Sequence, residues 1–332
     1  MDLDKLRKVL AGEPAFRLKQ AGQAIFKDLI ENWQEALVLP LPLRQKLAEE
    51  CPLKIEAETL ASADKKTIKA LITFDDGLKA ETVLMRYSDR NTVCVSSMFG
   101  CPLKCEFCAT GKIGFKRNLT ADEITEQVLF FNRYLKKENQ RVNSIVFMGM
   151  GEPFLNYDNV MGAVKTLNDK EGFNIGARHI SISTVGIIDG IEKLAKEPLQ
   201  VNLAISLHAA SDNLRSEIMP INQTQPLKSV LKAVESYFKT TRRKVMFEYI
   251  MIAGVNDSLE RARELVGLLS GLKSTAFMVN LISYNPTGIF KASTPKQIRD
   301  FEAVLEESGI EVTQRYRFGQ SIKAACGQLA GK

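Results

Sequence analysis

The chain has 332 residues, of which 45% are hydrophobic and 25% are charged, a composition typical of a globular protein with about two domains. This composition excludes a disordered or collagen-like chain and supplies enough apolar side chains for a large core. The first ten residues, MDLDKLRKVL, lack the apolar run of a signal peptide. No apolar stretch reaches the length of about eighteen residues that a membrane span requires. We therefore expect a cytoplasmic protein with no membrane partner.

The net charge of +6 is a mild excess of basic over acidic residues. Its distribution is more informative than its size, because the basic residues gather in five short clusters. Such clusters are typical of a polyanionic partner such as RNA, and they are also typical of ordinary solvated surface. The clusters are Lys65-Lys66-Lys69, Lys112-Lys116-Arg117, Lys136-Lys137-Arg141, Arg242-Arg243-Lys244 and Arg315-Arg317.

Three regions follow one another along the chain. Residues 1–55 are predicted to form a small helical accessory domain, with an amphipathic helix in FRLKQAGQAIFKDLI and a break at Pro40 and Pro42 before LRQKLAEE. Residues 56–90 contain short runs around Asp75-Asp76-Gly77, which favour a small β extension with a hairpin. From residue 91 to residue 332 the pattern changes to alternating strands and helices.

Six β-branched apolar runs in this last region predict strands at 92–97, 144–148, 180–184, 201–207, 245–251 and 277–283. Helices are expected at 120–137, 158–168, 187–196, 227–239, 258–270 and 295–308, the first beginning with a capping box formed by Thr120 and Glu123. Alternation of this kind indicates parallel strands joined by right-handed crossovers. Because six units are too few for a closed eightfold barrel, we predict an α/β fold with an open partial (β/α)6 barrel.

Polar, Gly-rich and Cys-rich segments follow these strands rather than precede them. In barrels of this kind the active site lies at the carboxyl ends of the strands. The pattern therefore predicts an enzyme. The segments are the cysteine cluster at 101–108, Gly149-Met150-Gly151-Glu152-Pro153, Ser183-Thr184, Ser206-Leu207-His208 and Asn285-Pro286.

Cys101, Cys105 and Cys108 form a CxxxCxxC motif. Clustered cysteines in a cytosolic chain indicate metal binding or catalysis rather than disulfides. Three thiolates can hold three corners of a [4Fe–4S] cluster and leave the fourth iron open. The alternative is a structural zinc site, which normally needs a fourth Cys or His, and the sequence has no second CxxC and only two histidines.

This spacing resembles the signature of the radical S-adenosylmethionine (SAM) superfamily. Longer segments resemble the RlmN/Cfr family of RNA adenine methyltransferases over nearly the whole chain from about residue 80, and more loosely before it. The resemblance implies that SAM binds the open iron and is cleaved there to a 5'-deoxyadenosyl radical. The segments are TVCVSSMFGCPLKCEFCATGKIGFKRNLTADEITEQV, FMGMGEPFLN, ISISTVG, SLHAASDNLRSEIMPIN, GVNDS, YNPT and AACGQL.

The resemblance also implies the reaction, which is methylation of C2 or C8 of an adenosine in RNA, with two SAM molecules per turnover. We expect C2 of an adenosine in 23S rRNA, with an adenosine in tRNA as a further substrate. Cys326 matches the cysteine that is first methylated, and Cys94 matches the cysteine that resolves the protein–RNA adduct and ends in a disulfide. Glu81 matches the proton acceptor. On residue type alone, Cys94 would be core packing and Glu81 a solvated carboxylate, whereas Cys326 has only small neighbours that leave its thiol accessible.

The SAM pocket carries over in the same way. Glu152 can accept a hydrogen bond from the SAM amine, and Gly151 permits close approach of the backbone. Five further residues match other SAM contacts of the family, although a Ser or Asn at a strand end is often a helix cap and a lone His is often part of the core. These residues are Ser183, Ser206, Leu207, His208 and Asn285.

Several alternatives remain open at this point. Pro153 after Gly-Glu resembles RlmN more than Cfr and favours C2, the other outcome being C8 methylation with antibiotic resistance. Gln320-Ser321-Ile322 stands where the family usually has acidic residues. A different class is an iron–sulfur module for RNA binding or electron transfer, but such a module needs neither a SAM pocket nor Cys326. As partners we expect RNA held through its phosphates and an electron donor such as flavodoxin, with the protein a monomer.

Overall fold

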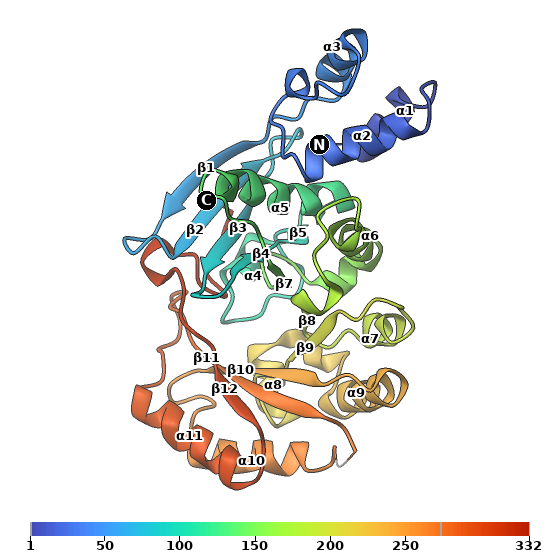
Figure 1. The fold of residues 1–332 in the computed structure, drawn as a ribbon. Coiled ribbons are helices and arrows are strands. Elements are labelled where there is room, and N and C mark those ends of the chain that lie inside the picture. The colour runs from blue at the N-terminus through green and yellow to red at the C-terminus, as the bar shows by residue number, and fades with distance from the viewer. Residues whose placement is uncertain (1, 273, 332) are drawn as a thin grey trace.

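The computed structural model describes residues 2–272 and 274–331. A sheet of ten strands runs through the molecule in the order β1-β2-β3-β4-β7-β8-β9-β10-β11-β12 (Figure 1). Every neighbouring pair from β4 to β12 is parallel, so the predicted open α/β barrel is confirmed. Its strands are β4 (Asn91–Cys94), β7 (Ser144–Phe147), β8 (Ile180–Thr184), β9 (Asn202–Ser206), β10 (Val245–Met251), β11 (Phe277–Ser283) and β12 (Val312–Gln314). The last was not predicted, because three residues with mostly exposed side chains carry no clear pattern.

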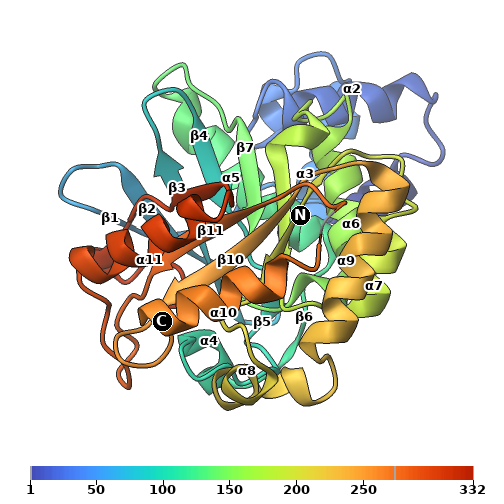
Figure 2. The same ribbon diagram turned by 90° about the horizontal axis from the view of Figure 1, so that it is seen from below.

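Helices cover the outer face of the barrel strands (Figure 2). The six expected helices are present, and the capping box of the first is formed, since Glu123 N donates to Thr120 Oγ1 at 3.2 Å and Thr120 N donates to Glu123 Oε2 at 2.8 Å. They are α5 (Ala121–Lys136), α6 (Tyr157–Asn168), α7 (Ile188–Leu194), α9 (Leu227–Thr241), α10 (Leu259–Leu269) and α11 (Pro295–Glu307). Shorter elements near the strand ends are β5 (Met98–Phe99), α4 (Ala109–Ile113), β6 (Arg117–Asn118), η2 (Pro153–Asn156), η3 (Ala177–His179), α8 (Asp212–Ile218), η4 (Pro220–Gln223) and η5 (Gln320–Ile322).

The β extension before the barrel has three antiparallel strands, β1 (Glu56–Ala61), β2 (Thr67–Thr73) and β3 (Lys79–Arg86). The turn predicted at Asp75-Asp76-Gly77 joins β2 to β3, and Gly77 adopts a φ of +78° there, which a residue without Cβ tolerates best. Strand β3 pairs antiparallel with β4. The extension therefore continues the barrel sheet at its first edge.

The amino-terminal helices lie beyond α5, far from β10–β12 (Figure 1). They are α1 (Leu3–Val9), α2 (Phe16–Phe26), η1 (Trp33–Glu35) and α3 (Leu41–Glu50). The prediction of a break at Pro42 was wrong, because this proline lies in the first turn of α3, where its missing N–H is not needed. The buried Trp33 side chain donates to the Cys51 carbonyl at 2.6 Å, which ties η1 to the end of α3 within the helical segment. Arg133 of α5 donates to the Leu53 carbonyl at 2.8 Å, and this bond joins the segment to the barrel.

No helix in the described part of the chain has both the length and the apolar character needed to cross a bilayer.

Candidate active site

A pocket opens where the parallel strands end. Four of the five segments predicted to follow strands contribute residues to it, together with Cys326, although they are far apart in the sequence. The carboxyl ends of parallel strands share one edge of the sheet, which explains this convergence. The predicted site residues that line the pocket are Cys101, Cys105, Cys108, Gly151, Glu152, Ser183, Ser206, His208 and Cys326.

The three cysteines lie on a loop closed at its base by the β5–β6 pair, in which Met98 faces Asn118. Gly100 is required in this loop, because a Cβ atom there would lie 1.6 Å from the Gly114 carbonyl oxygen. Burial raises the pKa of Cys101 to about 12 and that of Cys105 well above its ordinary value. Bound metal overcomes this cost, because thiol ligands bind as thiolates.

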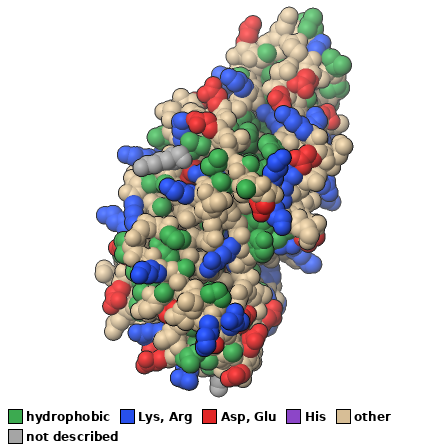
Figure 3. All heavy atoms as spheres, turned by 90° about the vertical axis from the view of Figure 1, so that its left-hand side faces the viewer, with side chains coloured by type: hydrophobic (Ala, Val, Ile, Leu, Met, Phe, Trp, Pro, Cys, Tyr) green, Lys and Arg blue, Asp and Glu red, His purple; other side chains and the backbone are tan. Residues whose placement is uncertain are grey.

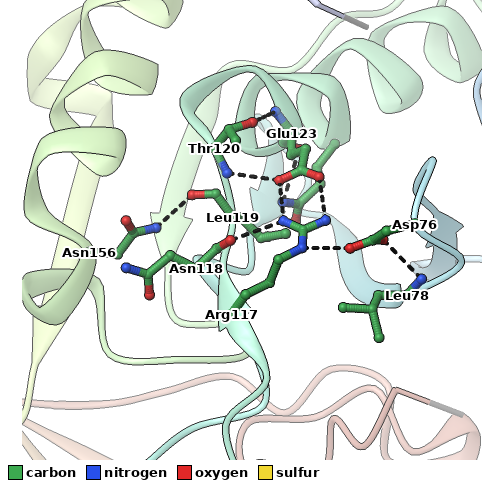
Figure 4. Close-up of polar contacts among 9 residues, drawn as sticks. Asp76, Leu78, Arg117, Asn118, Leu119, Thr120, Glu123 and Asn156 are labelled. Carbon is green, nitrogen blue, oxygen red and sulfur yellow. Dashed lines mark hydrogen bonds and ion pairs between the residues drawn. The ribbon is translucent and has the colours of Figure 1, made fainter.

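Arg117 of β6 fixes the base of the same loop (Figure 4). Its guanidinium donates to both carboxylate oxygens of Glu123, at 2.8 and 2.7 Å, and to Asp76 Oδ2 at 2.6 Å. It also lies 4.6 Å from the centroid of the Phe99 ring. Arg117 thus connects the cysteine loop to the β2–β3 turn and to the first turn of α5.

The cysteine loop offers the ligands of an iron–sulfur cluster. Three cysteine side chains line one pocket, and three thiolates can hold three corners of a [4Fe–4S] cluster while the fourth iron stays open. The donor set therefore fits the cluster.

Glu152 lines the pocket together with the cysteine loop and is almost fully buried. Its carboxylate accepts the amide hydrogens of Phe154, at 3.0 Å, and Val185, at 2.9 Å. Burial raises the pKa of Glu152 to about 7, although these hydrogen bonds act in the opposite direction. At Gly151, which has a φ of +101°, a Cβ atom would lie 2.6 Å from the Met98 Cβ. The GMGEP segment thus combines a tight backbone with a carboxylate able to accept from an amine.

Ser183 and Ser206 lie at the ends of β8 and β9, with their hydroxyl oxygens 3.4 Å apart. Leu207 does not line the pocket. Its side chain is fully buried in the core, and its amide donates to the Glu248 carbonyl at 3.0 Å. Any contact of Leu207 with a ligand would be through its backbone.

Arg215 of α8 was missed by the sequence analysis, although it lies within the SLHAASDNLRSEIMPIN segment. It is fully buried, and burial lowers its pKa to about 10. Its guanidinium donates to the carbonyls of Leu207 at 3.0 Å, Val185 at 2.6 Å and Ser206 at 3.1 Å. Arg215 therefore ties together the strand ends that carry the pocket serines.

Arg215→Leu is expected to lower the free energy of unfolding by about 3–5 kcal/mol, because it leaves several buried carbonyls without donors. Arg215→Lys should recover only part of this loss, since one ammonium cannot replace the guanidinium fork. Denaturant unfolding measures both changes, with the exposed Arg178 as the matched position for an Arg→Leu control. Equal stabilities for Arg215→Leu and Arg178→Leu would contradict the assignment.

His208 lies at the end of β9 with a φ of +60° and accepts the amide hydrogen of Ile250 on Nδ1 at 3.1 Å. Phe107, inside the CxxxCxxC motif, packs edge-on against its ring. Burial lowers the pKa of His208 to about 3 from its ordinary 6.5. The side chain is therefore a neutral imidazole whose Nδ1 accepts from Ile250, which leaves its one N–H, on Nε2, as a donor.

This depressed pKa predicts a pH dependence of stability. Below about pH 6.5 the unfolded chain binds a proton at His208 that the folded protein does not, so stability falls as the pH decreases toward 3. Between pH 6.5 and 5.5 the loss should be about 1 kcal/mol larger in the natural protein than in His208→Gln, whose amide oxygen can still accept from Ile250. Denaturant unfolding at the two pH values gives the difference, and equal losses would refute it.

A second pocket adjoins the first, and Cys326 lines both. Cys94, which is buried on β4, lines only the second. Arg315 also lines both pockets, and its Nη1 lies 2.9 Å from Met148 Sδ. Burial raises the pKa of Cys94 to about 12, while the positive charge of Arg315 acts in the opposite direction. Cys94 and Cys326 thus face one shared space beside the guanidinium of Arg315.

Asn285 is placed on the Cys326 segment rather than in the first pocket. Its Nδ2 donates to the Cys326 carbonyl at 3.2 Å, and its Oδ1 accepts from Gln320 at 2.9 Å. Gln320, which stands where the family usually has an acidic residue, is therefore held by a hydrogen bond to Asn285. Asn285 also lines the second pocket, and its hydrogen bond joins it to the Cys326 backbone.

Glu81 lines neither pocket and is buried on β3. One carboxylate oxygen accepts from Lys69 at 2.6 Å, and the other accepts the amide hydrogens of Ala330, at 2.6 Å, and Gly331, at 3.0 Å. In this structure Glu81 fastens the carboxyl-terminal segment that follows Cys326.

The basic clusters offer fewer free charges than the sequence suggests. Lys69 is paired with Glu81, Arg117 with two carboxylates, and Lys244 with Glu311 at 2.5 Å, while Arg243 donates to the Val201 carbonyl at 2.8 Å. On the face shown in Figure 3, Lys and Arg side chains are spread from end to end with Asp and Glu among them. Among the described residues of this face, the basic side chains therefore do not stand apart from the acidic ones.

Comparisons with known proteins agree with this geometry. The radical SAM superfamily matches residues 95–266. A probable dual-specificity RNA methyltransferase RlmN from Dictyoglomus thermophilum is 43% identical over 332 residues, covering 99% of this chain and 94% of that protein. The ribosomal RNA large subunit methyltransferase N of Nitrosopumilus maritimus is 45% identical over 329 residues, covering 96% of this chain and 93% of that protein. The crystal structure of a radical SAM methyltransferase from Sphaerobacter thermophilus has a TM-score of 0.95 at 42% identity, covering 100% of this chain and 98% of that one.

A partial barrel with three cysteines at its mouth is the architecture of a radical SAM enzyme, and the chain is a member of that superfamily. Within the superfamily it belongs to the RlmN family of RNA methyltransferases. Membership implies a [4Fe–4S] cluster and SAM as cofactors, for which the three cysteines and the adjoining pocket provide suitable groups.

Proposed function

We propose that the protein methylates C2 of an adenosine in 23S rRNA, and of an adenosine in tRNA, through a methylated Cys326 and with two SAM molecules per turnover. The observation that carries this proposal is that Cys326 lines both the pocket of the cluster cysteines and the neighbouring pocket of Cys94. A cysteine in that place can receive a methyl group on one side and deliver it on the other. The names of the two relatives, one a dual-specificity enzyme and one acting on large-subunit ribosomal RNA, support the two substrates.

The cluster and SAM, when bound, supply radical chemistry, which a ring carbon such as C2 requires because it is a poor nucleophile toward SAM. Cys101, Cys105 and Cys108 hold the cluster in this proposal. Glu152 accepts from the SAM amine, and Ser183, Ser206 and His208, with the backbone of Leu207, hold the rest of SAM.

Cys326 carries the methyl group, and its thiol must lose a proton to accept it. Asn285 keeps the Cys326 backbone in place. Cys94 resolves the adduct with RNA, leaving a disulfide with Cys326. Glu81 becomes the proton acceptor once the carboxyl-terminal segment releases it.

Residues 1–55 and the exposed basic side chains would hold RNA largely through its phosphates, with the target base turned out of its stack. A flavodoxin-type protein would supply electrons to the monomeric enzyme in the cytoplasm. The β extension of residues 56–90 would connect the RNA-binding part to the catalytic barrel.

The proposal is tested by mass spectrometry of 23S rRNA and tRNA from cells with and without the protein. We expect 2-methyladenosine in both RNAs only when the protein is present. Detection of 8-methyladenosine instead would show that the methylated carbon is C8 and not C2. Absence of both isomers would overturn the proposed methyltransferase function.

A further inference from the structure

Strand β10 places a carboxylate inside the first pocket. Glu248 interrupts the apolar run VMFEYIM, is only 2% exposed, and lines the pocket together with Ser206 and Cys326. Its Oε2 has no hydrogen-bond partner among the described residues. Arg315 Nη1 lies 3.7 Å from Oε2, which is beyond hydrogen-bonding distance.

The other oxygen of this carboxylate is held by a chain of hydrogen bonds. Thr313 Oγ1 donates to Asn280 Oδ1 at 3.1 Å, and Asn280 Nδ2 donates to Glu248 Oε1 at 3.2 Å. The three residues are partners in register across β10, β11 and β12. The side-chain amide of Asn280 accepts from Thr313 through its oxygen and donates to Glu248 through its nitrogen. This series of hydrogen bonds therefore fixes one orientation of the Glu248 carboxylate. Oε2 is then the oxygen left for a further donor.

A buried carboxylate oxygen without a donor costs free energy, and native structures seldom keep one without a functional reason. Arg315 compensates the charge but does not supply the missing hydrogen bond. A bound ligand can supply that donor, and a carboxylate selects a hydroxyl or amino group over an anion.

The surroundings indicate what carries that donor. Ser206 is the register partner of Glu248 on β9, and its hydroxyl lies 3.4 Å from that of Ser183. Ser183 on β8, Ser206 on β9 and Glu248 on β10 thus present polar groups on three neighbouring strands. Such a row suits a nucleoside, which carries ribose hydroxyls and amino groups.

We infer that Glu248 Oε2 accepts a hydrogen bond from a hydroxyl or amino group of a nucleoside bound in this pocket, either the adenosyl part of SAM or the target adenosine of RNA. The inference rests on the proposed function, which supplies both ligands. It makes Glu248 a ligand-binding residue, with Asn280 and Thr313 as the residues that position it.

The test uses Glu248→Gln, which preserves shape and can still accept from Asn280, but which places an NH₂ group where the free acceptor was. The affinity of the cluster-containing protein for SAM is measured by equilibrium dialysis, and its affinity for a 23S rRNA fragment with the target adenosine by filter binding. We expect one of the two to fall about tenfold or more, the usual size of a lost charge-assisted hydrogen bond. A fall for SAM identifies SAM as the source of the donor, and a fall for the fragment identifies RNA.

Glu302→Gln is the matched control, because Glu302 accepts from Gln314 at 2.7 Å on the outer side of β12 and lines neither pocket. It should bind both ligands normally. Should Glu248→Gln fail to fold, Thr313→Val is the deciding variant, because it leaves Glu248 intact but removes the hydroxyl that donates to Asn280. A loss of affinity for SAM or for the RNA fragment, smaller than the tenfold loss expected for Glu248→Gln, supports the inference.

Unchanged affinity for both ligands in a folded Glu248→Gln protein, or in Thr313→Val where that variant decides, would overturn the inference. If the natural protein itself bound neither SAM nor the RNA fragment, the proposed function would fail instead.

Discussion

Replacing any one of Cys101, Cys105 or Cys108 by alanine is expected to abolish both cluster assembly and SAM cleavage. The natural protein should take up about four irons per chain on anaerobic reconstitution and show visible absorbance that bleaches on reduction. Each alanine variant removes one of three thiolates that line a single pocket, and the described residues offer no fourth cysteine on that loop to replace it. Iron analysis and detection of cleaved SAM measure the two losses.

Cys51→Ala is the control for these variants. Cys51 is buried in the amino-terminal segment and uses its backbone carbonyl, not its thiol, to accept from Trp33. It should therefore keep a full complement of iron at a small cost in stability. Stoichiometric zinc without iron in the natural protein would refute the cluster assignment.

The barrel and the mouth of the pocket were predictable because they depend on local patterns. Short β-branched runs gave the barrel strands, and the polar segments that follow them gave Glu152 and Ser206. The cysteine loop was predictable from spacing alone. In each case residues near one another in sequence carry the signal, and the parallel topology brings the segments together.

Contacts between distant segments were not predictable in this way. Glu81 is separated by 250 residues from Gly331, whose amide it accepts, and no local pattern indicates such a pairing. The role of Arg215 depends on three carbonyls that converge only when β8 and β9 end side by side. For Glu248 a signal did exist, since one charged residue stood in an apolar strand, but its register with Asn280 and Thr313 required the sheet.

Cys94 and Cys326 should respond differently to substitution, because the proposed reaction gives them different tasks. Cys326 must be a thiolate to accept a methyl group. Cys326→Ala should therefore yield neither methyl-cysteine nor methylated RNA. Mass spectrometry of tryptic peptides and of nucleosides from the same cells measures both products.

Cys94 is needed only after the bond to adenine has formed, when the adduct between protein and RNA must be broken. It is buried on β4 and shares a pocket with Cys326 and Arg315. Cys94→Ala should therefore still load a methyl group on Cys326 and then stop as a covalent conjugate with RNA. On a denaturing gel the protein recovered from cells should give a shifted band that ribonuclease removes. A cysteine that only packs in the strand would instead cost some stability through a small cavity, so normal turnover without a shifted band would exclude Cys94 from the reaction.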